Sequence, residues 1–108
     1  MGNYILPRGI VRACAGIAES VDAEPYASYV AAAAAIIGAS YGDSPSAQHK
    51  RRQLAEAVRL NLINRREYPY ELLVRRFELA VSLSTFKREK YKYCYELARL
   101  CGFIGTQT

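Results

Sequence analysis

The run from Tyr26 to Tyr41 restricts the fold more than any other part of the sequence, because it is 16 residues long, apolar and rich in alanine. Alanine has the highest helix propensity and loses no side-chain entropy in a helix. The spacing of Tyr29/Val30, Ala33 and Ile37 within the run is helical. A membrane-spanning helix needs about 20 strongly apolar residues. We therefore expect one helix that packs into a protein core, and no membrane partner.

Prolines, glycines and capping residues divide the rest of the chain into further helices. Asp43 or Ser44 before Pro45, and Ser82 before an apolar repeat, are typical helix starts, and Gly102 is a typical helix end. The predicted helices begin near Pro7, Pro25, Pro45, Pro69 and Leu83, and they end near Val21, Tyr41, Asn64, Phe77 and Cys101. Phe103 and Ile104 are expected to fold back as an apolar clasp, before a short tail at 105–108. No strand pattern or internal repeat is present, so the fold class is all-α, a compact five-helix domain.

The chain of 108 residues, 51% of them apolar, fits a single helical domain over residues 1–108. Within it, residues 1–42 form an N-terminal helical pair that builds the core or mediates self-association as a homodimer. Residues 45–64 form a basic connecting helix. Residues 68–104 form a helix-turn-helix-like element at the C-terminal end.

Positive charge is concentrated in the second half of the chain. The net charge is +5, yet residues 1–49 sum to −2 and residues 50–108 sum to +7. Segregated positive charge favours a polyanionic partner such as nucleic acid, and a solvated helix face is the alternative. The triplet Lys50-Arg51-Arg52 lies near the start of its helix, where the dipole disfavours cations, so it indicates a partner or an exposed surface.

The helix from Leu83 to Cys101 is the predicted DNA-reading helix. In a helix-turn-helix, the start of the second helix enters the major groove. Here Ser82 caps the helix, Phe86 anchors it in the core, and Lys90 continues the basic surface. Polar and cationic side chains of this helix and of the preceding segments are expected to contact bases and phosphates. These residues are Ser82, Ser84, Thr85, Lys87, Arg88, Tyr91 and Lys92, with Arg65, Arg66, Arg75 and Arg76 on the flanks.

Three tyrosines alternate with other residues in this helix. Tyrosine rings between lysines can stack on unpaired bases. Tyr93 falls on the predicted core face, so we expect it to be buried. For Tyr91 and Tyr95 the two interpretations, stacking surface and core, remain open.

The C-terminal segment contains Val81-Ser82-Leu83-Ser84-Thr85-Phe86-Lys87-Arg88-Glu89-Lys90, then Glu96-Leu97-Ala98 and Gly102-Phe103-Ile104. With these motifs it resembles the end of the ArpU- and RinA-like phage transcriptional regulators over about residues 68–104. The resemblance implies a sigma-factor-like helix-turn-helix, a phage or prophage regulator of transcription, and RNA polymerase as a partner to consider. Sigma-like elements usually have an Ile-Ala pair in the first helix, and Arg75 and Arg76 stand at those positions here, so the bend between the two helices is expected to be longer.

Enzymatic chemistry has little support. The sequence shows no Gly-rich phosphate loop and no paired nucleophile and base. His49 has no metal-ligand partner at a suitable spacing, so neither cofactor nor metal is expected. Cys14, Cys94 and Cys101 are interpreted as buried thiols of a cytoplasmic protein without a targeting segment. Surface ion pairs are expected at Glu67, Glu71, Glu78 and Glu96. The alternative function is a small helical assembly, adaptor or nucleoprotein packaging protein.

Overall fold

Five α-helices and one short 3-10 helix make up residues 6–104, the part of the chain that the computed structural model describes. The helices are α1 (Arg8–Glu19), α2 (Tyr26–Ala35), α3 (Pro45–Ile63), α4 (Tyr70–Phe77) and α5 (Leu83–Leu100), with η1 (Ala39–Tyr41) between α2 and α3. The predicted all-α fold of five helices is confirmed. The predicted tail at 105–108 and the chain start at 1–5, where we expected no targeting segment, lie outside the described residues.

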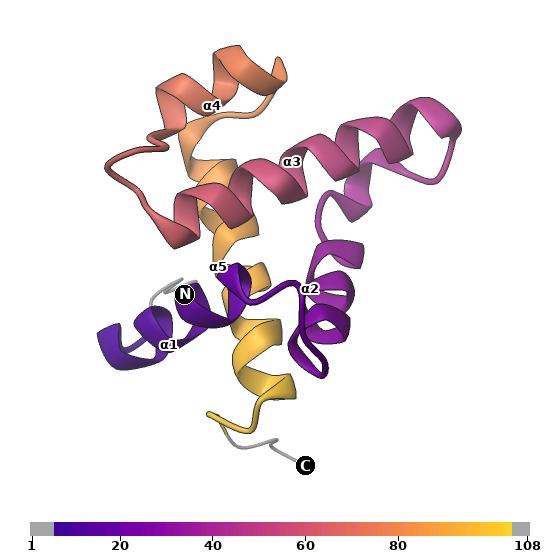
Figure 1. The fold of residues 1–108 in the computed structure, drawn as a ribbon. Helices are drawn as coiled ribbons and strands as arrows, with labels where there is room; N and C mark the ends of the chain where they lie inside the picture. Colours follow the sequence, from indigo (N-terminus) through magenta and orange to yellow (C-terminus); the bar gives the residue numbers. More distant parts are fainter. Residues whose placement is uncertain (1–5, 105–108) are drawn as a thin grey trace.

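α5 lies at the centre of the arrangement. It packs against α1, α2 and α3, and it crosses α3 in the middle of Figure 1. α1 and α2 lie on the two sides of α5 below α3, whereas α4 lies above α3 and packs mainly against it. No helix in residues 6–104 combines the length and the apolar character that a membrane crossing requires.

The core is built mainly from α3 and α5. Phe86, Tyr93 and Leu97 of α5 meet Leu54 and Val58 of α3, and each of these residues is at most 2% exposed. Fully burying a large apolar side chain stabilises the fold by about 1.5–3 kcal/mol relative to leaving it exposed. The core positions predicted for Phe86 and Tyr93 are therefore confirmed.

Local start and stop signals act as the sequence predicts. The Ser44 hydroxyl accepts a hydrogen bond from the backbone N–H of Ala47 at 3.1 Å, and the Ser82 hydroxyl accepts one from Thr85 at 3.2 Å. Both satisfy amide groups that a helix start leaves without partners. After α5, Gly102 has a φ of +77°, and the N–H of Phe103 reaches the carbonyl of Ala98 at 2.8 Å. This is the Schellman ending that glycine favours.

The single helix predicted from Pro25 to Tyr41 is wrong. α2 ends at Ala35, and the chain turns through Gly38, whose φ is +68°, into η1. A Cβ at Gly38 would lie 3.1 Å from the Arg51 side chain, so both the conformation and the space favour glycine. The apolar spacing continues across the break because Ile37 is fully buried after it. Spacing alone could not reveal the break.

Other expectations hold wholly or in part. Pro7, Pro25 and Pro69 lie immediately before α1, α2 and α4, so these helices begin within one residue of the predicted positions. The apolar clasp forms in part, because Ile104 packs against the core while Phe103 is 43% exposed.

The three cysteines are free thiols. Cys14 and Cys94 are buried as predicted, whereas Cys101 is only half-buried. The thiol of Cys14 donates to the backbone carbonyl of Cys94 at 3.4 Å, which ties α1 to α5. Within residues 6–104, no three His, Cys, Asp or Glu side chains come together as a metal site would require.

Candidate nucleic-acid interface

One face of α5 points away from the core. Ser84, Arg88, Tyr91 and Tyr95 follow one another at spacings of four, three and four, which places them in a row along the helix. We call these four residues the outward row. Ser84, Arg88 and Tyr95 are exposed and Tyr91 is half-buried. A helix with one face in the core and the other in solvent presents this row to any partner.

Lys87 and Arg88 supply free positive charge beside the outward row. Both are exposed, and neither has a hydrogen bond or an ion pair with another residue in 6–104. Most other arginines and lysines of α3 and α5 are less available, because Arg51, Arg59, Lys90, Lys92 and Arg99 all have polar partners. These two cations therefore remain available for an anion from outside the chain.

Lys90 is half-buried, so the expectation that it continues the exposed basic surface is wrong. Its ammonium donates to the side-chain oxygen of Asn61 at 2.7 Å, and the Asn61 amide donates to the carbonyl of Tyr68 at 2.8 Å. These bonds join α5 to α3 and to the connector before α4. Burial lowers the pKa of Lys90, and the charges of Arg65 and Lys87 lower this pKa further. The connector residue Arg65 thus lies close enough to α5 to add to its positive potential.

Lys92 is neutralised within its own helix. Its ammonium lies 3.1 Å from one carboxylate oxygen of Glu89, while the other oxygen accepts a hydrogen bond from the backbone N–H of Gly38 at 2.9 Å. Glu89 is only 6% exposed. Glu89 is not among the site residues predicted from the sequence. The three-residue spacing to Lys92 was a visible signal for the pair, but the burial of Glu89 against the turn at Gly38 was not.

Ser82 and Thr85 hold the start of α5 together. In addition to accepting from the Thr85 amide, the Ser82 hydroxyl lies 3.1 Å from the Thr85 hydroxyl and 3.1 Å from that of Ser84. Thr85 is half-buried and Ser84 is exposed. Ser82 is also exposed, so two of the three hydroxyl residues predicted at the interface are accessible from outside.

The predicted basic residues before α5 divide into two groups. Arg65 and Arg66 are exposed in the connector that precedes α4. Arg75 and Arg76 are exposed in the last turn of α4, at its other end, where cations stabilise the helix dipole. Arg76 also lies over the Phe77 ring, 5.8 Å from its centroid. In residues 6–104, no hydrogen bond or ion pair joins Arg75 or Arg76 to α5.

The structure does not confirm the helix-turn-helix pair. The link between α4 and α5 covers residues 78–82, longer than the usual three to four residues, and Glu78 in it has a φ of +54°. α4 packs mainly on α3. It reaches α5 through Tyr70, whose ring meets that of Phe86 edge-on at 5.4 Å and whose hydroxyl donates to the carbonyl of Val81. The longer bend expected from Arg75 and Arg76 agrees with this geometry.

Two tyrosines of the outward row form an aromatic surface. The rings of Tyr91 and Tyr95 lie 5.8 Å apart between centroids, with 32° between their planes. Tyr95 is 40% exposed. Between the two interpretations left open, stacking surface and core, Tyr95 lies at the surface and Tyr91 has an intermediate position.

The expected surface ion pairs form only in part. Glu96 pairs with Arg99, and this contact lowers the pKa of the Glu96 carboxyl. For Glu67, Glu71 and Glu78, residues 6–104 contain no ion pair within 4.0 Å, so that expectation is wrong. In the basic triplet, Arg51 has an internal explanation, because its guanidinium donates to the carbonyls of Ala35, Ile37 and Gly42.

Comparison with known proteins assigns the chain to no family. No protein-family model, no curated protein and no solved structure matches the chain.

Proposed function

We propose that this protein binds duplex DNA through the first half of α5 and the neighbouring connector. The observation that carries the proposal is the group of cations around this part of the helix. Lys87 and Arg88 are exposed and unpaired within residues 6–104, and the charge of Arg65 acts on the same region. Phosphates of a DNA backbone would supply the counter-charges that the chain does not provide.

The outward row fits the chemistry of base contacts. A guanidinium such as that of Arg88 can donate two hydrogen bonds to guanine in the major groove. Ser84, one turn earlier on the same face, offers a hydroxyl, while Lys87 and Arg65 would contact phosphates. In this arrangement phosphate contacts position α5, and Arg88 and Ser84 select the sequence.

The resemblance of residues 68–104 to ArpU- and RinA-like proteins refines the proposal to a phage or prophage regulator of transcription. A nucleoprotein packaging protein with the same basic face is the competing function. The two differ in selectivity, because packaging depends on phosphates alone. Selection of bound duplexes from a random pool distinguishes them. Enrichment of one sequence supports the regulator, and uniform binding supports packaging.

The salt dependence of binding to a duplex tests the proposal itself. Each phosphate contact contributes about −0.9 to the slope of log affinity against log salt. We expect the double variant Lys87→Ala/Arg88→Ala to bind at least tenfold more weakly, with a slope reduced by about 1–2. The matched control is Arg8→Ala/Arg12→Ala, which removes the same charge from two exposed positions of α1. Equal losses in both variants, or no duplex binding by the wild type at low salt, would contradict the proposal.

A further inference from the structure

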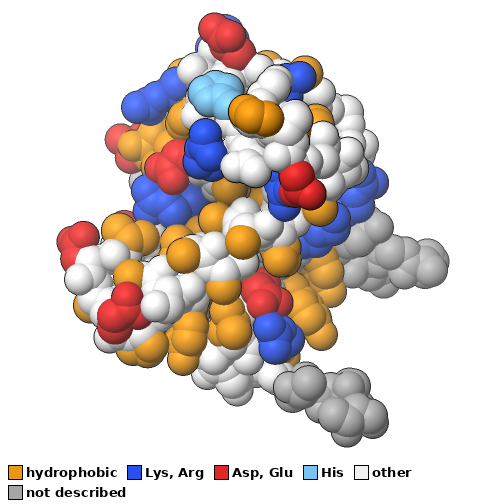
Figure 2. Space-filling view, turned by 90° about the vertical axis from the view of Figure 1, so that its right-hand side faces the viewer, with side chains coloured by type: hydrophobic (Ala, Val, Ile, Leu, Met, Phe, Trp, Pro, Cys, Tyr) orange, Lys and Arg blue, Asp and Glu red, His pale blue; other side chains and the backbone are white. Residues whose placement is uncertain are grey.

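A groove of about 980 Å³ lies between α2 and α3. One wall is formed by small side chains of α2, chiefly Ala27, Ala31 and Ala34 with Val30. The other wall is polar and belongs to α3. In Figure 2, which views the side of the molecule where α2 lies in Figure 1, hydrophobic side chains gather in the lower half and most of the visible Lys and Arg side chains in the upper half. The alanines are short enough to let another helix approach α2 closely.

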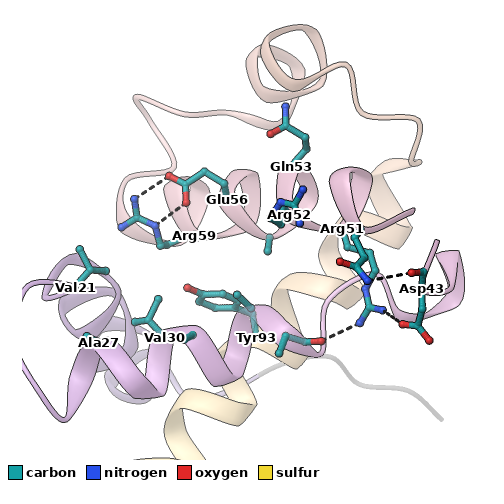
Figure 3. A pocket seen from close by; sticks show the side chains of 15 residues that line it. Val21, Ala27, Val30, Asp43, Arg51, Arg52, Gln53, Glu56, Arg59 and Tyr93 are labelled. Carbon is teal, nitrogen blue, oxygen red and sulfur yellow. Dashed lines mark hydrogen bonds and ion pairs between the residues drawn. The ribbon is translucent and has the colours of Figure 1, made fainter. Parts of the chain in front are cut away.

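Tyr93 contributes to the floor of this groove. Figure 3 shows its ring beneath Arg59, with the hydroxyl turned toward the end where Val21 lies. The hydroxyl is buried and has no hydrogen-bond partner in the described part of the chain. Buried hydroxyls nearly always have a partner. The Tyr93 hydroxyl is thus a polar atom at the groove floor for which the described residues supply no hydrogen bond.

The two ends of the groove carry opposite charge. Asp22 and Glu24 do not line the groove, but they follow Val21 in the sequence and are exposed in the loop that leads into α2. Glu56, which lines the groove, is already paired with Arg59. At the opposite end, Arg51 is paired with Asp43, whereas Arg52 is exposed and has no ion pair within residues 6–104. Figure 3 shows these ends as the Val21 side and the Arg51 side of the groove.

We propose that this groove binds a second copy of the same chain, with the two α2 helices antiparallel across a twofold axis. A twofold axis places the acidic end of one groove against the basic end of the other, so Asp22 and Glu24 of each copy face Arg52 of its partner. Such an interface is isologous, and each charge contact occurs twice. The same patch is thus complementary to itself in shape and in charge, which a groove of uniform charge would not be.

The oligomeric state of the full chain tests the proposal without any DNA. We expect sedimentation equilibrium to show a concentration-dependent dimer, and Ala31→Glu to weaken it at least tenfold. Ala31 is exposed on α2, so the variant keeps the fold, which circular dichroism checks. Ala80→Glu is the matched control, since Ala80 is also exposed but lies outside the groove. A monomeric wild type would overturn the proposal and leave the groove to another partner. Equal dimerisation of both variants would also overturn it.

Charge reversal tests the antiparallel arrangement. Asp22→Lys and Arg52→Glu each introduce two repulsive contacts into a homodimer of the variant. In a mixed dimer of the two variants, position 22 of each copy faces an opposite charge at position 52 of the other. We therefore expect each variant alone to dimerise at least fivefold more weakly than the wild type, and the mixture to recover most of the loss. A mixture as weak as its components would overturn the arrangement.

Discussion

The carboxylate of Glu89 on α5 accepts a hydrogen bond over 2.9 Å from the backbone N–H of Gly38, 51 residues away in the sequence. This contact fastens the turn after α2 to the central helix. Because Glu89 is buried, removal of its carboxylate leaves the Gly38 amide without an acceptor.

The first prediction follows from this contact. Glu89→Ala should lower the free energy of unfolding by about 1–3 kcal/mol, which is the usual cost of an unsatisfied buried group. Glu89→Gln should lose less, because its amide oxygen can still accept from Gly38. Urea denaturation measures both. Glu67→Ala, at an exposed carboxylate without an ion pair in the described residues, is the control and should change stability by less than about 0.5 kcal/mol. If Glu89→Ala is as stable as the wild type, the contact between Glu89 and Gly38 does not stabilise the fold.

Arg51 gives the second prediction. Its guanidinium reaches three backbone carbonyls around the end of α2, at Ala35, Ile37 and Gly42. Arg51→Ala should cost about 1–3 kcal/mol of stability, and Arg51→Lys should recover less than half, because an ammonium lacks the planar fork of donors.

The ion-pair partner of Arg51 and its sequence neighbour provide the controls. The Asp43 side chain is 91% exposed, so Asp43→Ala should have little effect. Lys50→Ala removes an adjacent exposed cation and should also be neutral. If thermal denaturation shows that Asp43→Ala loses as much stability as Arg51→Ala, then the ion pair stabilises this turn and the carbonyl contacts do not.

Tyr93 gives a prediction of pH dependence. Burial raises the pKa of its hydroxyl well above the ordinary value of about 10. Above pH 10 the unfolded chain releases this proton and the folded chain keeps it. The folded state then binds more protons, so the free energy of unfolding falls as pH rises, by up to about 1.4 kcal/mol per pH unit. Below pH 10 both states hold the proton, and this contribution to the pH dependence vanishes.

The Tyr93→Phe variant isolates that slope. All other residues are the same in both proteins, so the difference between the two stability profiles from pH 8 to pH 11 reports Tyr93 alone. We expect the wild type to lose stability relative to the variant only above about pH 10. Parallel profiles over the whole range would show that the pKa of Tyr93 is the same in the folded and unfolded chains.

Ser82 gives a prediction that separates folding from binding. Ser82→Ala removes the cap of α5 and should cost about 1 kcal/mol of stability. Ser82→Asp supplies an equivalent cap and a favourable charge at the helix start, so it should restore stability. The same aspartate should weaken DNA binding, because it adds negative charge beside Lys87 and Arg88. Chemical denaturation and duplex affinity are measured on both variants. An aspartate variant that binds DNA as tightly as the wild type would place the DNA elsewhere.

Local signals made much of the fold predictable from sequence. The caps at Ser44 and Ser82 and the end at Gly102 depend on neighbours within a few residues, and all three are confirmed. The end of α2 was not predictable, because Arg51 and Glu89 stabilise the turn at Gly38 from distant positions in the chain. Apolar spacing continued past that turn and concealed it.

The candidate interface shows the same division. The exposure of Lys87 and Arg88 followed from the position of Phe86 on the core face, which periodicity reveals. Lys90 is half-buried because it binds Asn61 of another helix, so no local sequence pattern could indicate its position. The groove between α2 and α3 likewise exists only once the two helices are packed together.

The central position of α5 restricts how its sequence can change. Its inward face contacts three other helices, so mutations there disturb the whole domain. Three of the four residues in the outward row are exposed, so substitutions of Ser84, Arg88 and Tyr95 disturb the fold less. If the row reads DNA, related chains could acquire new binding preferences through a few substitutions along one side of a single helix while keeping the same scaffold.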